Sequence, residues 1–328
     1  MVRSPQPDTA LYSHNMKDNI ITAFFKNLRF FLFSRKGWKK IDELKKTQDA
    51  ILLELLTLRY RDSSDPDIQL ALRYLSEKPN AKEMFPYALT KTAGSIECHY
   101  DNQEGLPYVI HKGHRLYFPK RYKKEHVEWY YRFAIESDDI VGNGFRERSP
   151  HQYATKGYPV EDGAVLVDAG AAEGLFSLEM IDKIKKAYLV ECDPQWEKPL
   201  RCTFKPWNDK VEIILKKLSN NDDGDNVSLQ TLLKKEQRES LFIKMDIEGS
   251  EIGTLQGAKE ELTNRESPVT LACCTYHREQ DYDAIHSFFY EIGYQSEVSK
   301  GYVLTNLNDG NGIYTFRHGV LRASNQKH

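Results

Sequence analysis

The 328-residue sequence has little cysteine, no long apolar run and almost no net charge, and each of these absences excludes a class of protein. Its five cysteines form no Cys-x-x-Cys pair and no pattern typical of a secreted disulfide framework. No run of 18 apolar residues could span a bilayer, and the polar, proline-containing start does not resemble a secretory signal. Lys and Arg number 46 against 48 Asp and Glu, so the basic excess of a dedicated nucleic-acid binder is missing.

The composition is that of a folded protein with a sizeable core. Hydrophobic residues make up 40% of the sequence and charged residues 29%, a balance that excludes global disorder. At about 150 residues per domain, the length predicts two parts. We place an N-terminal helical and hairpin lobe at 1–150 and an α/β domain at 151–328. The expected location is the cytoplasm.

The N-terminal part has a helical pattern. After a polar stretch at 1–15, apolar residues recur at helical spacing to about residue 75. Residues 16–47 hold nine Lys and Arg against three Asp and Glu, beside the apolar run Phe30–Phe33. Such a segment can lie on an anionic membrane surface, which would place the protein at the inner face of the membrane. The alternative, which we favour, is a helix that packs its aromatic face into the lobe or a dimer interface.

A β-hairpin and a further helix follow. The apolar stretches Pro107–His111 and Arg115–Phe118 flank a Lys-Gly-His turn, which predicts two antiparallel strands. A helix is expected around 126–135.

From Gly163 onward, strands and helices alternate at short intervals. Apolar strands separated by helices predict a mostly parallel sheet covered on both faces, with ligands bound beyond the C-terminal ends of its strands. We expect strands at 164–168, 187–191, 211–218, 241–246, 269–276, 294–304 and 313–316. We expect helices at 175–185, 195–204, 250–262 and 281–292.

The first of these strands leads into a glycine-rich loop, Asp-Ala-Gly-Ala-Ala-Glu-Gly at Asp168–Gly174, whose small residues let the backbone approach a ligand closely. The second strand ends in Glu191, where a carboxylate can accept both hydroxyls of a ribose. A dinucleotide site needs Gly-x-Gly-x-x-Gly, which this loop lacks, and Glu173 would repel a pyrophosphate. A cationic amino-acid ligand, S-adenosylmethionine, fits the loop better. A glycine turn that only packs a helix on a strand is the remaining interpretation.

The fourth strand continues into a second motif, Lys-Met-Asp-Ile-Glu-Gly-Ser-Glu at Lys244–Glu251, followed by Leu-Gln-Gly-Ala. With the loop and the acidic second strand, it resembles the FkbM family of S-adenosylmethionine-dependent O-methyltransferases over residues 163–316, roughly half of the chain. The stretches Ser149–Tyr153 and Thr275–Asp281 resemble sugar-modifying members. The resemblance implies a class I methyltransferase fold, which is a Rossmann-like, mostly parallel seven-stranded sheet with helices on both faces. The N-terminal lobe has no such resemblance.

The resemblance also implies roles for residues of this chain. S-adenosylmethionine would be the cofactor, and a sugar hydroxyl of a polysaccharide or glycan would accept the methyl group. Asp168, Gly170 and Gly174 would line the methionine half of the cofactor, and Glu191 would hold its ribose. The full set of expected cofactor-binding residues is Asp168, Gly170, Ala171, Glu173, Gly174, Glu191, Cys192, Asp193, Leu218, Ser219 and Asp246.

A general base would assist transfer to a hydroxyl and is worth about 10²–10⁴ in rate. His277, at the C-terminal end of the fifth strand, is the first candidate, with a purely structural role as its alternative, and Asp246 is the second. Asp246, Glu248 and Glu251 could also hold a divalent metal. We expect instead that the two glutamates cap the following helix and that no metal is bound.

Two other functions fit parts of the sequence. An NAD-dependent Rossmann oxidoreductase would share the fold and is disfavoured by the loop. A methyltransferase-like scaffold that binds glycan or membrane without turnover is disfavoured because Asp168, Gly170, Glu191 and Asp246 are all present. The expected partners are therefore a small-molecule cofactor and a sugar or glycan, with no nucleic acid. A membrane contact through 16–47 and a homodimer stay open.

Overall fold

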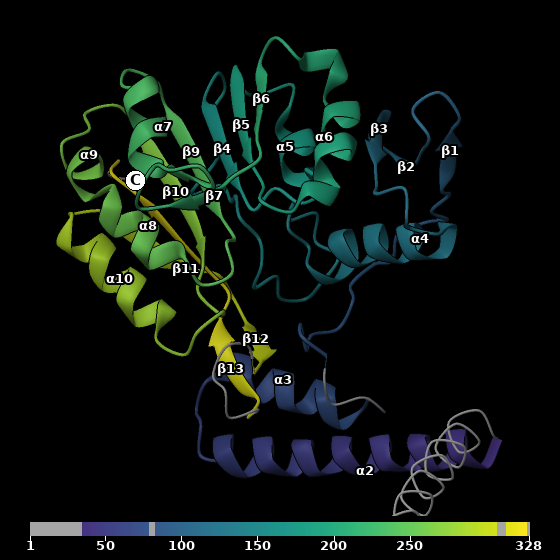
Figure 1. Cartoon of the computed structure of the whole chain (residues 1–328). Helices are drawn as coiled ribbons and strands as arrows, with labels where there is room; N and C mark the ends of the chain where they lie inside the picture. Colours follow the sequence, from purple (N-terminus) through teal and green to yellow (C-terminus); the bar gives the residue numbers. More distant parts are fainter. Residues whose placement is uncertain (1–34, 79–82, 307–312, 327–328) are drawn as a thin grey trace, which may run out of the picture.

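The computed structural model describes residues 35–78, 83–306 and 313–326, with side chains from residue 39 onward within them. The segment 16–47 therefore lies largely outside the described residues. In the described part of the chain, no helix combines the length and the apolar character needed to cross a bilayer. Figure 1 shows one large sheet between two sets of helices, with a further pair of helices at the bottom of the view.

Seven strands form the central sheet. They are β4 (Val165–Ala169), β5 (Lys186–Val190), β6 (Val211–Ile214), β9 (Leu241–Met245), β10 (Val269–Cys274), β11 (Gln295–Val298) and β14 (Val320–Ser324). Their order in the sheet is β11-β14-β10-β9-β4-β5-β6. Neighbours run parallel from β10 to β6, whereas β14 is antiparallel to both β10 and β11. The mostly parallel seven-stranded sheet of the class I methyltransferase fold is thereby confirmed, and its strand order reverses beside β4, where open α/β sheets bind ligands.

Helices cover both faces of the sheet. They are α5 (Leu175–Met180), α6 (Glu197–Thr203), α7 (Leu229–Lys235), α8 (Glu251–Gly257), α9 (Lys259–Thr263) and α10 (Asp281–Glu291). Side chains alternate along a strand, so Val165 and Val167 of β4 pack on the α7, α8 and α10 face and Leu166 on the α5 and α6 face. By the same alternation Asp168 shares the face of Leu166, and the parallel register sets it opposite Lys244 of β9.

Several expected elements are shorter than the sequence pattern indicated. The helix expected at 175–185 ends at Met180, and the one at 250–262 divides into α8 and α9. The strand expected at 211–218 ends at Ile214. A separate strand β7 (Lys217–Ser219) follows and pairs with β8 (Asn226–Ser228).

The end of the chain differs from our expectation. The strand expected at 294–304 divides into β11 and β12 (Tyr302–Thr305), and the stretch 313–316 belongs to β13 (Thr315–His318). Strands β12 and β13 pair only with each other, outside the main sheet. The prediction that 313–316 supplies the seventh strand is therefore wrong, because β14 takes that position.

A buried arginine explains why β14 was missed. Arg322 stands in the middle of this strand at 2% exposure, where a charge breaks the apolar pattern that predicts a buried strand. Its guanidinium donates hydrogen bonds to the backbone oxygens of Gln152 and Tyr153, at 2.6 and 3.0 Å. The last strand thus anchors the linker that precedes the sheet.

The first two described helices form a small core of their own. Helix α2 (Arg35–Tyr60) and helix α3 (Pro66–Ser76) pack on the β12–β13 pair, with Leu56 and Phe316 among the buried residues. Helix α3 begins after Asp65, whose carboxylate accepts hydrogen bonds from two amides of the first turn.

The expected hairpin is present and packs against the main sheet. It consists of β2 (Leu106–His111) and β3 (His114–Tyr117), with β1 (His99–Asp101) added at one edge. Helix α4 (Lys124–Arg132) follows and continues into a π-helical turn, η1 (Phe133–Ser137). Their buried residues share one cluster with the α5 and α6 face of the sheet. The buried residues before 150 therefore belong to two clusters.

Gly170 and Gly163 offer a matched test of the glycine-rich loop. Their φ angles are +71° and +76°, but only a Cβ at position 170 would lie 1.9 Å from the Asp246 carbonyl oxygen, whereas one at 163 meets nothing within 4 Å. We expect Gly163→Ala to lower the free energy of unfolding by about 1–2 kcal/mol, the cost of a left-handed backbone. Gly170→Ala should lower it further, because the end of β9 must move. Chemical denaturation measures both, and equal losses would contradict a tight approach.

Candidate active site

Two cavities meet beyond the C-terminal ends of β4 and β9. The outer cavity has a volume of about 670 Å³ and the inner cavity about 210 Å³. Tyr130, Gly170, Ala172 and Asp246 line both of them, so the two adjoin each other. They lie at the reversal of strand order, where the fold predicts a ligand.

Glu191 borders the outer cavity just after β5. Its Oε2 accepts a hydrogen bond from the amide of Ala172 at 2.9 Å, and its Oε1 accepts one from the amide of Asp193 at 2.7 Å. These bonds hold the carboxylate against the glycine-rich loop and leave further lone pairs for hydroxyl donors. Leu218 and Ile247 add apolar lining to the same cavity.

Two of the four described non-glycine residues with a left-handed φ border the outer cavity. Ala172 and Glu248 have φ angles of +46° and +57°, in a region that residues with a Cβ rarely adopt. Ala172 stands where many methyltransferases have glycine, and its left-handed φ explains that preference. A residue keeps such a strained backbone conformation only where the surrounding structure holds it in place.

The inner cavity is built around a buried ion pair. Lys244 Nζ lies 3.2 Å from Asp168 Oδ1 and donates to the Gly170 carbonyl at 2.6 Å. Ser177 Oγ donates to the other oxygen of Asp168 at 2.6 Å. Asp168 was expected to supply negative charge to a cationic ligand, but Lys244 already neutralises it. In this structure the pair fastens the glycine-rich loop to β9.

Glu173 supplies the negative charge that Asp168 does not. It lines the inner cavity at 6% exposure, and its Oε2 accepts a hydrogen bond from Tyr130 at 3.1 Å. Within the described residues, no Lys, Arg or His forms an ion pair with it. Burial raises the pKa of Glu173 to about 7. A cation entering the inner cavity would favour its ionised form.

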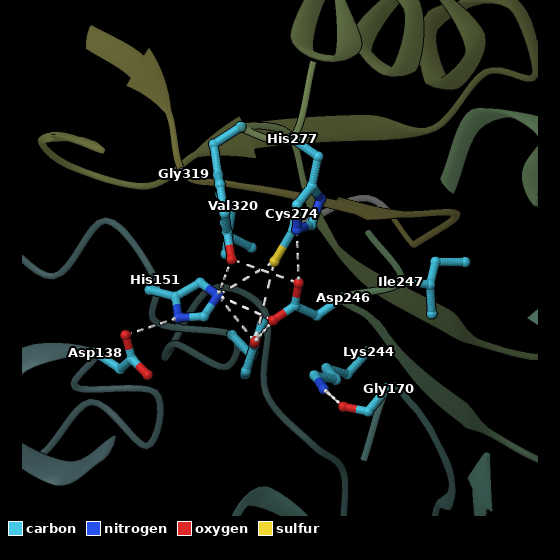
Figure 2. Close-up of polar contacts among 12 residues, drawn as sticks. Asp138, His151, Gly170, Lys244, Asp246, Ile247, Cys274, His277, Gly319 and Val320 are labelled. Carbon is cyan, nitrogen blue, oxygen red and sulfur yellow. Dashed lines mark hydrogen bonds and ion pairs between the residues drawn. The ribbon is translucent and has the colours of Figure 1, made fainter. Parts of the chain in front are cut away.

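Asp246 is the centre of a polar cluster, and Figure 2 shows its carboxylate between His151 and His277. Its Oδ2 accepts from the Tyr153 hydroxyl at 3.1 Å and lies 3.4 Å from His151 Nε2. Its Oδ1 lies 3.2 Å from His277 Nε2 and 3.5 Å from the Tyr276 hydroxyl. Burial raises the pKa of Asp246, but the two histidines lower it well below its usual range. Asp246 is therefore ionised at neutral pH.

His277 is placed to support Asp246. Its ring is 1% exposed and lines neither cavity, with Nε2 on Asp246 and Nδ1 3.1 Å from Glu251 Oε1. Burial lowers the pKa of His277, but the two carboxylates raise it to about 10. An imidazolium at neutral pH cannot take up a proton, so this geometry argues against the expected role of His277 as general base.

His151 lines the inner cavity and was not among the site residues expected from the sequence. Its Nε2 lies 3.0 Å from the Tyr153 hydroxyl, and its Nδ1 lies 3.6 Å from Asp138. Burial lowers the pKa of His151, but Cys274 and the carboxylates of Asp138 and Asp246 raise it well above its usual value. The one available signal was the Ser149–Tyr153 stretch, and a histidine in a linker has no fixed position until the fold is known.

Acids and imidazoles alternate through the cluster in the order Asp138, His151, Asp246, His277 and Glu251. Each imidazolium has a carboxylate on both sides, so both positive charges are compensated, and the acids outnumber the imidazoles by one.

The structure brings most of the expected cofactor-binding residues to the two cavities. Asp168, Ala171 and Glu173 line the inner cavity, Glu191, Cys192, Asp193 and Leu218 line the outer one, and Gly170 and Asp246 line both.

Two of the expected residues line neither cavity. Gly174 begins helix α5, where a Cβ would lie 2.7 Å from Phe204, so its role is close packing. Ser219 ends β7 and donates a hydrogen bond to the Asn221 carbonyl at 3.0 Å. Asp193 does line the outer cavity, but its carboxylate caps the short helix η2 (Pro194–Trp196).

Two groups of described residues could supply three metal ligands, namely His151, Asp246 and Cys274, and Asp246, Glu251 and His277. In the second group the imidazole lies between the two carboxylates and contacts both. Glu251 stands in the first turn of α8, but its Oε1 accepts a hydrogen bond from the Ile247 amide at 2.9 Å, which lies ahead of that helix. Glu248 is 83% exposed, and its Oε2 lies 3.8 Å from His277 Nε2.

No protein-family model and no curated protein matches the chain. Among solved structures, it is similar to the methyltransferase FkbM from Methylobacillus flagellatus KT, with 21% identity and a TM-score of 0.39. That match covers 50% of this chain and 44% of the other, so the chain spans less than half the length of that protein.

Two further solved structures extend the comparison. The precorrin-6y C5,15-methyltransferase from Geobacter metallireducens GS-15 is 16% identical, with a TM-score of 0.33 over 50% of this chain and 80% of that one. A Streptococcus mutans protein in complex with SAH is 17% identical, with a TM-score of 0.34 over 50% of this chain and 90% of that one. The chain is thus similar to methyltransferases of known structure, among them a member of the family that its Lys244–Glu251 motif resembles.

Proposed function

We propose that this chain is an S-adenosylmethionine-dependent O-methyltransferase that acts on a hydroxyl group of a sugar in a polysaccharide or glycan. The observation that carries the proposal is a pair of joined cavities with one acid suited to each end of the cofactor. Glu191 in the outer cavity can accept hydrogen bonds from a ribose, and Glu173 in the inner cavity can pair with a cation. S-adenosylmethionine has a ribose and a cationic amino-acid end at the two ends of one molecule.

The outer cavity suits the adenosine end. Glu191 is fixed by two backbone amides, so its free lone pairs face a ribose without the entropy cost of ordering a mobile side chain. Leu218 and Ile247 offer apolar surface for a flat base.

The inner cavity suits the amino-acid end. Glu173 and Tyr130 can receive an ammonium group, while Lys244 is within the same cavity for a carboxylate. A pyrophosphate at this position would face Glu173, so the lining supports the methyltransferase over an NAD-dependent oxidoreductase.

Asp246 is our choice for the residue that contacts the acceptor. When bound, S-adenosylmethionine supplies an electrophilic methyl group, and most of the remaining catalysis is positioning. Asp246 lines both cavities and stays ionised because His151 and His277 face it. Its carboxylate accepts the hydrogen bond of the acceptor hydroxyl. Because the pKa of Asp246 is low, it takes the proton only as the new C–O bond forms and the methyl–sulfur bond breaks, when the acceptor oxygen becomes strongly acidic.

A sugar acceptor is supported by an aromatic surface at the rim of the inner cavity. Trp129 lines this cavity although it is 58% exposed, and its ring stacks on Phe133 with the centroids 5.5 Å apart. Because this indole is exposed and Phe133 fixes its orientation, a sugar ring can stack on it.

Cofactor binding is the first test. We expect calorimetric titration to give micromolar binding of S-adenosylmethionine and S-adenosylhomocysteine and none of NAD. Glu191→Ala should abolish binding because the ribose loses its acceptor, whereas Glu197→Ala, at a partly exposed side chain that lines neither cavity, should leave it unchanged. Binding of NAD alone would contradict the methyltransferase, and cofactor binding without transfer to any acceptor would leave a non-catalytic scaffold.

Glu173 should make cofactor affinity depend on pH. Its pKa of about 7 in the empty site means that below pH 7 it must lose a proton to pair with an ammonium. Affinity should therefore rise by up to about tenfold per unit between roughly pH 5.5 and 7, below the pKa of the ligand amine. Glu173→Gln should remove this dependence and Glu197→Gln should keep it. The same titration at each pH measures it, and an unchanged slope in Glu173→Gln would contradict the assignment.

Asp246→Asn should lower turnover by about 10²–10⁴-fold, because an amide neither holds a negative charge nor accepts the proton. His277→Gln should reduce it less, since it acts through Asp246. Transfer of a labelled methyl group to an acceptor found by screening sugars and glycans gives the rates. EDTA should leave them unchanged. Full turnover in Asp246→Asn would refute its role, and loss of activity in EDTA would restore a metal.

A further inference from the structure

Helix α2 exposes an apolar face that the main fold does not use. Of the ten large hydrophobic residues exposed in the described part of the chain, four lie on this one helix. They are Leu44, Ile51, Leu55 and Leu58, with exposures of 60, 52, 59 and 55%. Contiguous apolar surface of this kind marks an interaction site.

The face has the spacing of a coiled coil. Ile41, Leu44, Gln48, Ile51, Leu55 and Leu58 follow one another at alternating intervals of three and four residues. We call this row the α2 seam. In heptad notation Ile41, Gln48 and Leu55 occupy a positions, and the other three occupy d positions. This 3.5-residue repeat fits a helical partner, because a membrane-bound or core-packed helix has a broader stripe of period 3.6.

The side of α2 that borders the seam at the e and b positions is already occupied. Leu52 and Leu56 are 9% and 1% exposed and belong to the small core with α3. Figure 1 shows α3 beside the C-terminal half of α2, with the N-terminal half running past it. With one free face, α2 can pair with a single further helix.

We infer that the α2 seam pairs with the α2 seam of a second copy of this chain in a parallel, two-stranded coiled coil. A polar residue in the middle of an a row sets register, and a parallel dimer places Gln48 against the partner's Gln48, where the two amides can bond each other. The same arrangement sets Glu54, at g, near the partner's Arg59, at e. The inference does not depend on the proposed function.

The charges also predict how salt acts on the pairing. Lys40 and Lys45 occupy the preceding g and e positions, so a parallel dimer brings like charges together at the N-terminal end of the seam. A symmetric dimer makes both the Lys40–Lys45 and the Glu54–Arg59 contacts twice, so salt screens a repulsion and an attraction together, and the apolar layers of the seam are not screened. Association should therefore persist as ionic strength rises.

Sedimentation equilibrium of the full chain over a concentration series tests the pairing. We expect a monomer–dimer equilibrium that Leu55→Glu weakens by at least about tenfold, because a charge would be buried in the seam. Gln48→Leu should tighten it by about tenfold, since a polar a residue costs stability. Thr57→Glu adds the same charge to the same helix away from the seam and should change nothing. Circular dichroism of each variant checks that α2 is still folded.

Cysteine cross-linking tests the orientation. In a parallel dimer Gln48→Cys places the two thiols across the seam, so mild oxidation should link the copies, whereas the off-seam control Thr57→Cys should not link. A dimer in which Gln48→Cys fails to cross-link would overturn the parallel arrangement.

Other occupants of the seam would give different results. A wild-type chain that stays monomeric to about 1 mM, or a dimer that Leu55→Glu leaves intact, would overturn the inference. So would a monomer that binds anionic phospholipid vesicles through the same residues, because that result would assign the seam to a membrane.

Discussion

The ion pair between Lys244 and Asp168 is the contact on which the rest of the site depends. Two adjacent parallel strands bring the groups together, and neither reaches solvent. Such a pair adds little net stability, since desolvation offsets its attraction, but removing one partner would strand the other charge. Its effect is to fix the positions of the two segments that carry its partners. Because the ammonium also holds the Gly170 carbonyl, the loop and the end of β9 move as one body. Both cavities take their walls from these two segments.

Asp246, at the reacting end of the site, is also fixed by contacts from segments that lie far apart in the sequence. Its carboxylate is held by residues from the linker before the sheet and from the segment after β10, so no single loop determines its position. The imidazole of His277 carries the restraint on to Glu251, which in turn holds the amide of Ile247. A network that is fully paired stiffens a site, and one with a missing member leaves a buried charge.

The sequence predicted the parts of this architecture that are local in the chain. The Asp168–Gly174 loop and the Lys244–Glu251 motif each lie on one strand–loop–helix unit, so their spacing alone locates a site. The sequence did not predict contacts between residues that lie far apart in the chain. Asp168 looked free for a ligand because Lys244 is 76 residues away, and His277 looked like a base because its second carboxylate lies on another helix. Arg322 concealed a strand for the same reason, since its acceptors lie in a distant linker.

The Arg322 contact also sets an order of events during synthesis. Its acceptor in Tyr153 lies 169 residues earlier, in the linker that carries His151. At about 5–20 residues per second, a ribosome would finish that linker some 10–30 s before β14 exists to hold it. The nascent chain therefore has the glycine-rich loop long before it has a complete inner cavity. The linker that carries His151 gains its Arg322 anchor only when the last strand of the sheet is in place.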